Sequence, residues 1–393
     1  MNQSSPTVLW SRGFLLLSLS SALLFAGFHL LLPTLPLFAA AYGATTTQIG
    51  LIIGGFTFSA IGVRLFVTAG IRRWGRHRFL QRGLVICILA MSTYYFTNQA
   101  MTTLLVRLFH GVGFGIASTV FAALAIEYIP VSRRAEGMGY FGLGATLMMA
   151  VAPLIGLWFY ENFQSAGLFA AATSIQLLAL VILGLLPAAA PDAGVPAHRA
   201  AALSLRPFIF PCFLALLLGI CLGSVMSFIT LLAKERHLDN PGLFFMFSTS
   251  GVFFVRTFSG RIYDRHGAAW VIVPAAFFLS LSMYFLYSNN VSLLVAAAFY
   301  GIGLGILFPS LQTWFSQMVT LEQQTAVNAL YYNTLDIGVG GGSILLGWLA
   351  QGKSYAVIYE VSFVLSLIFL GSYLAYLWRL KRLKSRQSLS QTL

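Results

Sequence analysis

Long apolar runs recur along the whole 393-residue chain, and they constrain its fold more than any other feature. A helix of about 20 residues crosses the hydrocarbon core of a bilayer, so such a run predicts a transmembrane helix. The chain is 58% hydrophobic and only 8% charged, so a water-soluble fold could not bury its apolar surface. We therefore predict an all-α membrane protein. Its twelve predicted spans are residues 14–40, 46–70, 79–97, 103–127, 137–160, 166–187, 207–233, 243–262, 268–288, 291–318, 327–350 and 356–378.

Basic residues are distributed unevenly between the two predicted faces of the membrane. One face collects seventeen Lys and Arg residues and the other three, and cytoplasmic loops are the ones enriched in positive charge. An even number of spans puts both termini on that cytoplasmic side. This distribution, with a basic tail at Arg379 to Arg386, accounts for the net charge of +13 without a nucleic-acid partner. The expected location is a bacterial cytoplasmic (inner) membrane.

The sequence offers little for catalysis or metal binding. Cys87, Cys212 and Cys221 all fall inside predicted spans, where thiols behave as small apolar groups. The chain has no phosphate-binding loop, no nucleophile elbow and no pair of histidines at metal-ligand spacing. We therefore predict that the protein is not an enzyme, uses neither cofactor nor metal, and draws its energy from an ion gradient.

The two halves of the chain resemble each other at an offset of 190 to 192 residues. Residues 49–80 match 241–272 at eight positions, and the glycine-rich run 110–116 resembles 300–306. A break rich in Pro and Ala at 187–206 indicates a linker. We predict two pseudo-symmetric six-helix bundles, at 1–187 and 207–393, with a cytoplasmic linker at 188–206 and a basic cytoplasmic tail. The aligned pairs include Arg64 with Arg256, Arg73 with Arg265 and Gly75 with Gly267.

The loop 260–267 reads Gly-x-x-x-Asp-Arg-x-Gly, and residues 107–113 read Arg-x-x-His-Gly-x-Gly. They resemble two signatures of the major facilitator superfamily of transporters, the first of which follows the second helix of a half and the second of which lies on the fourth helix. The run 152–156, Ala-Pro-x-x-Gly, partly resembles the signature of proton-coupled exporters with twelve spans. The first-half loop departs from the pattern, because Thr68 replaces the glycine and Arg72 replaces the aspartate. The resemblance covers essentially the whole chain and implies two halves that rock about a midplane site.

Charged residues near the predicted cytoplasmic helix ends suggest a conformational gate. Arg64 and Arg256 either anchor helix ends or take part directly in transport. The pair Asp264 and Arg265 would bind neighbouring helix termini in one conformational state and release them in the other. Glu127, close in sequence to Arg133, would be a gate or an anchor. The predicted gate comprises Arg64, Arg72, Arg73, Gly75, Glu127, Arg256, Gly260, Asp264, Arg265 and Gly267.

Arg107 and His110 lie one turn apart on the fourth predicted helix and share a face. Arg107 would either bind an anionic group or a carboxylate partner, or anchor the helix at the membrane interface. The glycines at 111, 113 and 115 would allow another helix to approach closely. His29, four residues before Pro33, is either a packing residue or part of the pathway, and Pro33 would loosen its helix.

Asp336 lies near the middle of the eleventh predicted span. Tyr332, Asn333, Asp336, Gly340 and Ser343 share a helical face that is too polar for lipid. The carboxyl group would carry a proton between the two sides of the membrane, make a structural hydrogen bond, or bind substrate without protonation. The repeat places Tyr140 opposite Tyr332. The predicted substrate and proton pathway comprises Asp336, Arg107, His110, His29, Tyr332, Asn333 and Tyr140.

Together these features predict a secondary transporter that exports a small amphipathic, anionic or zwitterionic molecule in exchange for protons by alternating access. Its export direction rests on the resemblance, and a drug-like compound or a secreted metabolite such as a metallophore would fit. The alternative is a proton-coupled importer of a sugar or an organic acid. A membrane receptor or membrane enzyme would need a large soluble loop or a catalytic cluster, and the sequence has neither. We expect a functional monomer whose partners are its substrate, protons and the bilayer.

Overall fold

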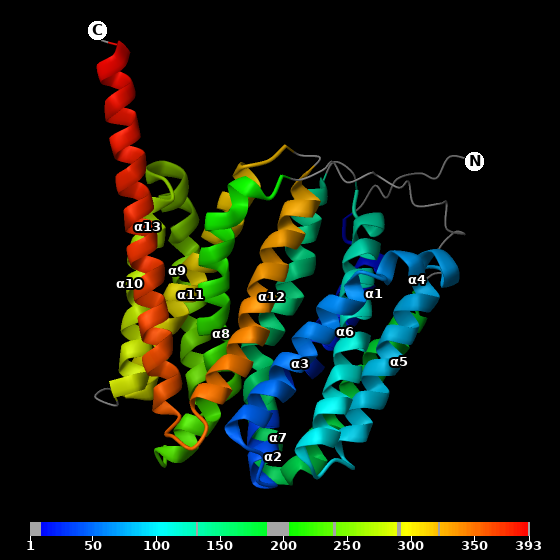
Figure 1. Cartoon of the computed structure of the whole chain (residues 1–393). Coiled ribbons are helices and arrows are strands. Elements are labelled where there is room, and N and C mark those ends of the chain that lie inside the picture. The colour runs from blue at the N-terminus through cyan, green and yellow to red at the C-terminus, as the bar shows by residue number, and fades with distance from the viewer. Residues whose placement is uncertain are drawn as a thin grey trace, which may run out of the picture. The chain divides into compact units, whose positions relative to one another are not determined.

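The computed structural model describes residues 9–130, 133–186, 204–238, 241–288, 292–320 and 323–391. Helices dominate this described part, which contains no β-strand (Figure 1). The helices are α1 (Arg12–Leu31), α2 (Thr34–Ala41), α3 (Thr46–Arg64), α4 (Val67–Trp74), α5 (Arg76–Tyr94), α6 (Ala100–Tyr128), α7 (Arg134–Gly184), α8 (Ile209–Glu235), α9 (Gly242–His266), α10 (Ala269–Ser288), α11 (Leu293–Gln317), α12 (Gln324–Leu349) and α13 (Ala356–Gln391).

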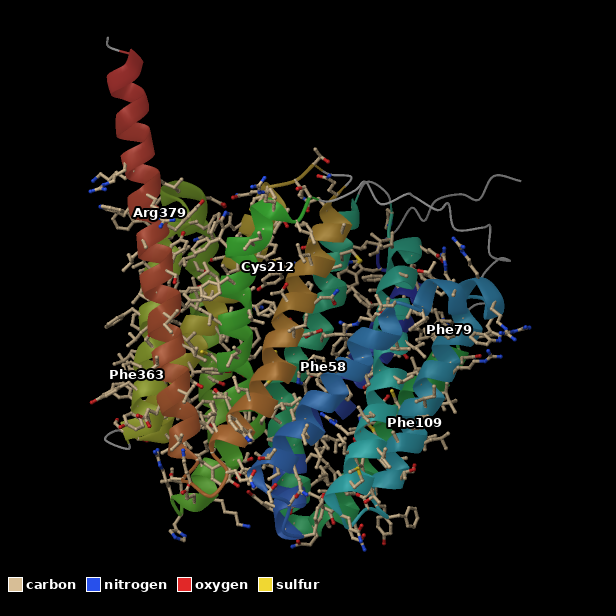
Figure 2. The ribbon with its side chains drawn as sticks, in the orientation of Figure 1. Phe58, Phe79, Phe109, Cys212, Phe363 and Arg379 are labelled. Atoms are coloured by element: carbon tan, nitrogen blue, oxygen red, sulfur yellow. The ribbon has the colours of Figure 1, made fainter. Side chains whose placement is uncertain are left out.

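The prediction of an all-α, multi-pass membrane protein is confirmed. Nine segments of the described chain are long and apolar enough to cross a bilayer. One of them, α7, contains two predicted spans and leaves helical geometry between them at Gln164, where φ is 58°. Two further predicted spans correspond to α5 and α12. Large apolar side chains such as Phe58 and Phe109 are more than 40% exposed, as expected for helices that face lipid (Figure 2).

Pro33 divides the first predicted span into α1 and α2. A proline has no N–H group to donate to the carbonyl one turn earlier. The N–H of Leu32 donates to the His29 carbonyl instead, at 3.3 Å, and the Thr34 hydroxyl donates to the Leu30 carbonyl at 2.9 Å. The expected loosening of the helix at Pro33 is therefore confirmed, and the freed carbonyls remain satisfied inside the membrane.

The predicted second span, 46–70, is wrong over its last residues. Helix α3 ends at Arg64, and a separate helix, α4, begins at Val67. The physical reason is that α4 has one buried apolar face and one exposed polar face. Val67 and Gly70 of α4 are buried, whereas its positions 68, 69, 72 and 73 are exposed. A short helix with one polar face suits the membrane interface rather than its interior.

The chain divides into two compact units, which are described separately. Unit 1 comprises 1–198, 226–242 and 343–351, and unit 2 comprises 199–225, 243–342 and 352–393. Most of the predicted linker, 188–206, lies outside the described residues. The boundary of the two predicted bundles therefore stays a prediction.

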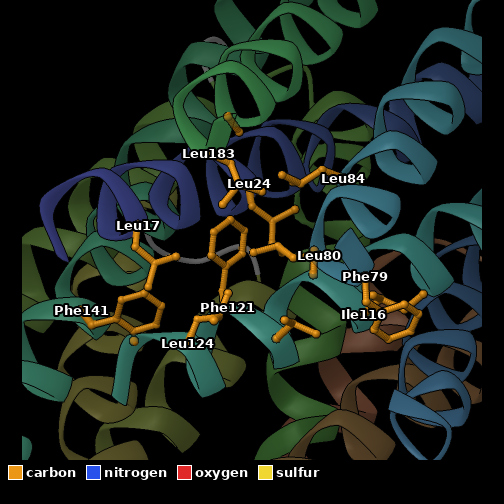
Figure 3. Close-up of a cluster of buried hydrophobic side chains, with 14 of the residues drawn as sticks. Leu17, Leu24, Phe79, Leu80, Leu84, Ile116, Phe121, Leu124, Phe141 and Leu183 are labelled. Carbon is orange, nitrogen blue, oxygen red and sulfur yellow. The ribbon is translucent and has the colours of Figure 1, made fainter. Parts of the chain in front are cut away.

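Apolar side chains of α1, α5, α6 and α7 form a core in unit 1. Leu24 of α1, Leu80 and Leu84 of α5, Phe121 of α6 and Leu183 of α7 are buried together there (Figure 3). Lipid tails are as apolar as these side chains, so the helices are held by close packing rather than by exclusion of water. This packing fixes the position of α6, which carries Arg107 and His110.

The glycine runs of the two halves make equivalent contacts. Gly111 of α6 lies against the backbone carbonyl of Phe56 in α3, and Gly301 of α11 lies against the carbonyl of Ser248 in α9. A Cβ atom at either glycine would collide with that carbonyl. The prediction that these glycines allow close helix packing is confirmed. Since the contacts recur at the offset found in the sequence, the internal repeat extends to three-dimensional structure.

Gly75 and Gly267 are a second equivalent pair. Their φ angles are 75° and 88°, values that glycine adopts without a steric penalty. Each N–H donates to a backbone carbonyl four residues earlier at 2.8 Å, that of Ile71 for Gly75 and that of Tyr263 for Gly267. Both glycines therefore end a helix in the same way, which explains why the repeat retains them.

We expect Gly111→Ala to lower the melting temperature of the purified protein in detergent. The added methyl group would enter space held by the Phe56 carbonyl and the Ser59 hydroxyl, and overpacking costs about 1–3 kcal/mol. The matched control is Gly62→Ala in α3, where nothing lies within 4 Å of the added carbon. That variant should be unchanged or slightly more stable, because alanine favours helix. Thermal unfolding followed by tryptophan fluorescence measures both, and equal melting temperatures would contradict the packing.

Candidate functional site

Arg107 is completely buried in unit 1, with an exposed fraction of 0%. It belongs to a stripe of α6 that also buries Thr103, His110, Phe114 and Ala117. Because these positions repeat every three or four residues, the stripe is the face that α6 packs against its neighbours. Arg107 therefore lies among the packed helices of unit 1.

His110 and Tyr94 accompany Arg107 in this interior. Nη1 of Arg107 lies 3.5 Å from Nδ1 of His110, and the Tyr94 hydroxyl lies 3.4 Å from the same nitrogen. A guanidinium nitrogen only donates hydrogen bonds, so Nδ1 must be the acceptor. The ring proton of a neutral His110 then lies on Nε2. The sequence prediction placed Arg107 and His110 together correctly but missed Tyr94.

Three buried nitrogens in this cluster have no hydrogen-bond partner: Nε and Nη2 of Arg107, and Nε2 of His110. Nε and Nη2 form one edge of the guanidinium, the edge whose two parallel N–H groups match a carboxylate. Within the described ranges, no carboxylate contacts Arg107. Arg107 thus presents two parallel N–H groups, on Nε and Nη2, that have no hydrogen-bond acceptor among the described residues. We call this pair of donors the Arg107 fork.

Aromatic rings enclose the Arg107 fork. The guanidinium carbon lies 4.2 Å from the ring centre of Phe56 and 5.7 Å from that of Phe28. The two rings stack at 4.7 Å, and both also contact Phe114. A cation over an aromatic face is stabilised by the electrons of the ring, which offsets part of the cost of burying the charge. Phe56 is buried and Phe28 is half-buried.

His29 lies beside the Phe28 ring, with centres 5.0 Å apart, and its Nδ1 is buried without a partner. The aromatic cluster therefore links His29 to the neighbourhood of Arg107. Tyr140 is elsewhere in unit 1. Its ring packs against Trp10 at 4.8 Å, and Trp10 precedes Phe28 by 18 positions, about 27 Å along a helix. Tyr140 is not brought to the Arg107 fork.

A second polar cluster lies in unit 2. Tyr332 and the half-buried Asp336, both on α12, interact electrostatically, and Tyr332 also interacts with Arg256 of α9 and Gln312 of α11. The Gln312 side chain donates to the Asn328 side chain at 3.3 Å. Arg256, predicted as a gate residue, thus belongs with Asp336 and Tyr332. Asn333 is half-buried on the same helix.

The other predicted gate residues lie mostly at the surface. Arg72, Arg73, Gly260, Asp264, Arg265 and Gly267 are exposed, and Arg64 is half-buried. Glu127 forms an ion pair with Arg76 of α5, which the sequence analysis did not anticipate. Arg133 binds Glu136 instead, through two hydrogen bonds of 2.7 and 2.6 Å. Among the described residues, no group of three or more His, Cys, Asp or Glu side chains could hold a metal.

Further contacts in unit 1 join α2 and α3 to the ends of α8 and α12. The Thr230 hydroxyl donates to the Pro33 carbonyl at 2.9 Å, and the Thr47 hydroxyl contacts both the Gly347 carbonyl and the Gln351 side chain. Gly50 of α3 leaves no room for a Cβ atom against the Ser343 carbonyl. Thr47, Gly347 and Gln351 lie near the side of the membrane predicted to be extracytoplasmic.

We expect cysteines introduced together at Thr47 and Gln351 to be joined by a short bifunctional thiol reagent. The two side chains are in direct contact, so the reagent needs to span only a few ångströms. The experiment requires Cys87, Cys212 and Cys221 to be replaced by alanine first. Gel mobility after proteolysis in the linker detects the link, and each single-cysteine variant is its control. Absence of crosslinking in membranes would contradict the contact between Thr47 and Gln351.

Ionisable groups within a multi-pass helical protein mark functional sites, and the paths of ions and substrates through membrane transporters are among them. The family model of the Major Facilitator Superfamily matches residues 17–262 and 242–392. The chain therefore belongs to the Major Facilitator Superfamily. It is a transporter and not an enzyme.

Curated relatives align along most of the chain. An uncharacterized MFS-type transporter of Methanocaldococcus jannaschii is 22% identical over 364 residues, covering 87% of this chain and 92% of that protein. The staphylopine export protein of Staphylococcus aureus is 21% identical over 381 residues, covering 90% and 94%. An uncharacterized MFS-type transporter of Burkholderia pseudomallei is 27% identical over 324 residues, covering 77% and 78%.

Solved structures share the fold. The crystal structure of the nucleoside transporter NupG superposes with a TM-score of 0.74 at 14% identity, covering 92% of this chain and 98% of that one. A bacterial homolog of the human lysosomal transporter Spinster, in an inward-facing and occupied conformation, gives 0.69 at 17% identity, covering 94% and 96%. These similarities establish the architecture and say nothing of the substrate.

Proposed function

We propose that this transporter exports a small amphipathic molecule with an anionic or zwitterionic group in exchange for protons. The observation that carries the proposal is the Arg107 fork. Each buried donor without a partner costs about 1–3 kcal/mol, and more when it is charged. An anionic group of the substrate would supply the missing acceptor and recover that cost, so binding at the fork is selective for anions.

The surroundings of the Arg107 fork favour an amphipathic substrate. Phe28, Phe56 and Phe114 offer aromatic faces beside the cation, and His110 offers one further donor at Nε2. An apolar body would rest on the rings while its carboxylate or similar group binds the arginine. Phe28 is the half-buried member, so it is the ring that would move to admit the substrate.

Proton coupling is assigned to Asp336. A half-buried carboxylic acid beside Tyr332, with Arg256 interacting with the same tyrosine, responds to small changes in solvation and charge. Such an acid would bind a proton in one conformational state and release it in the other. A purely structural hydrogen bond and substrate binding without protonation remain the alternatives for this residue.

The direction of transport rests on the similarity to an export protein and on the resemblance of the Ala-Pro-x-x-Gly run to an exporter signature. The chain is similar to the staphylopine export protein, which is named for export. The Ala-Pro-x-x-Gly run also has a structural role, because Gly156 of α7 leaves no space for a Cβ atom against the Leu30 carbonyl of α1. A secreted metabolite such as a metallophore or a drug-like compound fits this class. The alternative function is proton-coupled import of a sugar or an organic acid.

We further propose that the protein works as a monomer in the bacterial inner membrane with both termini in the cytoplasm. The asymmetry of Lys and Arg supports this topology. Cysteine accessibility at the C-terminal segment in intact and permeabilised cells would test it.

Untargeted metabolite comparison tests the proposed function. Cells that lack the protein should retain a compound that overexpressing cells release into the medium, and that compound should carry a carboxylate, a phosphate or a zwitterionic group. Depletion of the compound inside the deletion cells would favour import and overturn the export proposal. A neutral, uncharged compound would overturn the role of the Arg107 fork.

A further inference from the structure

Helix α4 presents a surface that the transport mechanism does not use. Val67 and Gly70 face inward, and Gly70 lies directly against the ring of Phe79 in α5. Trp74 stacks on the same ring, with centres 5.6 Å apart and an interplanar angle of 21°. Helix α4 is therefore held firmly on α5, and its opposite face is left to the surroundings.

The exposed side of α4 and the start of α5 carry a cluster of arginines. Figure 2 shows nitrogen atoms of basic side chains gathered at this end of unit 1, near the labelled Phe79. Arg82 lies over the Trp74 ring at 4.4 Å and Arg73 approaches it at 5.2 Å. Contact with the Trp74 ring orients Arg73 and Arg82 before any ligand binds. The exposed members of the cluster are Arg72, Arg73, Arg78 and Arg82.

These four arginines lack carboxylate partners in the part of the chain that the structure describes. Glu127 forms its ion pair with Arg76. This carboxylate therefore does not neutralise the charge of the other four arginines. Their mutual repulsion costs free energy unless an external anion lies among them. The surface is therefore complementary to a negatively charged partner.

Exposed apolar side chains lie next to these charges. Leu65 and Phe66, in the bend between α3 and α4, are 79% and 68% exposed. Apolar groups beside a row of cations match the boundary where lipid headgroups meet acyl chains. The same combination would be costly in water, so a soluble partner accounts for the charges but not for Leu65 and Phe66.

The second half of the chain provides an internal comparison. There α9 continues without a break to His266, and Asp264 occupies the position equivalent to Arg72. The second-half loop thus contains its own carboxylate, whereas the first-half loop has a cation in that place. The first-half loop is the one that needs an anion from outside the protein.

We propose that the α4 surface, made of Leu65, Phe66, Arg72, Arg73, Arg78 and Arg82, binds the phosphate groups of anionic phospholipids. Arginine suits this partner because its planar fork binds phosphate oxygens through two parallel hydrogen bonds. Leu65 and Phe66 enter the acyl region beside the headgroup. The lipid supplies the negative group that Asp264 supplies in the other half.

Native mass spectrometry of the delipidated full-length protein, titrated with phosphatidylglycerol or phosphatidylcholine, tests this proposal. The wild type should retain phosphatidylglycerol in preference to phosphatidylcholine. The triple variant Arg72→Gln, Arg73→Gln, Arg78→Gln should bind phosphatidylglycerol on the order of a hundredfold more weakly, since each interfacial charge contributes roughly fivefold. Arg82 is kept so that Trp74 retains its cation.

The matched control is the double variant Arg261→Gln, Arg265→Gln in the second-half loop, where both side chains are also exposed. Its affinity for phosphatidylglycerol should remain within about threefold of the wild type, well short of the roughly 25-fold loss expected for removing two charges at the α4 surface. Equal losses in the two variants would show a general charge effect and overturn the proposal. If the triple variant fails to fold, the single variants Arg72→Asp and Arg72→Gln are compared instead. Arg72→Asp should bind phosphatidylglycerol more weakly than Arg72→Gln does.

Competition with glycerol 3-phosphate separates a lipid from a soluble phosphate compound. Millimolar glycerol 3-phosphate should leave the bound phosphatidylglycerol in place, because it lacks the acyl chains that contact Leu65 and Phe66. Displacement at that concentration would assign the arginines to a soluble phosphate ligand and overturn the lipid proposal.

Discussion

Asp336→Asn is expected to abolish proton-driven transport while leaving exchange of substrate across the membrane intact. Asparagine has nearly the same size and polarity as aspartic acid but cannot bind and release a proton. The substrate site would still form, so labelled substrate should exchange with unlabelled substrate at near wild-type rates. Transport in proteoliposomes with and without a pH gradient measures both activities. The matched control is Glu360→Gln, which removes an exposed carboxylate of unit 2 and should change neither.

The three interpretations of Asp336 lead to different outcomes. Loss of gradient-driven transport with exchange retained supports proton coupling. Loss of both activities with an unchanged melting temperature would assign Asp336 to substrate binding. Loss of both with a lower melting temperature would indicate a structural hydrogen bond. Normal gradient-driven transport by the variant would contradict all functional roles for this residue.

Arg107→Met is expected to reduce transport of an anionic substrate by at least about thirtyfold. Removing one partner of a buried charged pair costs about 2–5 kcal/mol, and 1.4 kcal/mol corresponds to a factor of ten. The melting temperature should stay the same or rise, because methionine removes a buried charge with two unpartnered donors. His110 keeps the Tyr94 contact at Nδ1 in this variant.

Arg107→Lys is the companion to that experiment. Lysine keeps the positive charge but has no planar fork, so an intermediate loss is expected. Uptake of the compound found by metabolite comparison, measured over a range of concentrations, provides the transport data. Wild-type transport by Arg107→Met would contradict anion binding at the fork. A large fall in its melting temperature would show that Arg107 is a structural residue instead.

The membrane architecture was predictable because it follows from local properties of the chain. Apolar run length fixes which segments cross a bilayer, and the repeat shows in sequence through residues such as Gly75 and Gly267, whose backbone angles exclude most alternatives. The division between α3 and α4 was missed, since the run through Leu65 and Phe66 remains apolar while the chain turns. Local hydrophobicity does not reveal a turn made at the membrane interface.

The candidate site was only partly predictable. Arg107 and His110 share a helix face, so their proximity follows from helix geometry. Tyr94 and Phe56 come from other helices, and in a chain that is 15% aromatic neither residue stands out. The same limit applies to Glu127, whose partner is Arg76 and not its nearer neighbour Arg133. Contacts between helices depend on packing, which a single sequence shows only where glycines permit close approach.

Proton movement in everted membrane vesicles tests the central claim most directly. Vesicles that contain the transporter are acidified inside by respiration, and the compound retained by deletion cells is then added outside. The account predicts that the wild type dissipates the pH gradient, seen as recovery of the fluorescence of a pH-sensitive dye, and that Asp336→Asn does not. A gradient that the wild type leaves unchanged while it transports the compound would contradict the account.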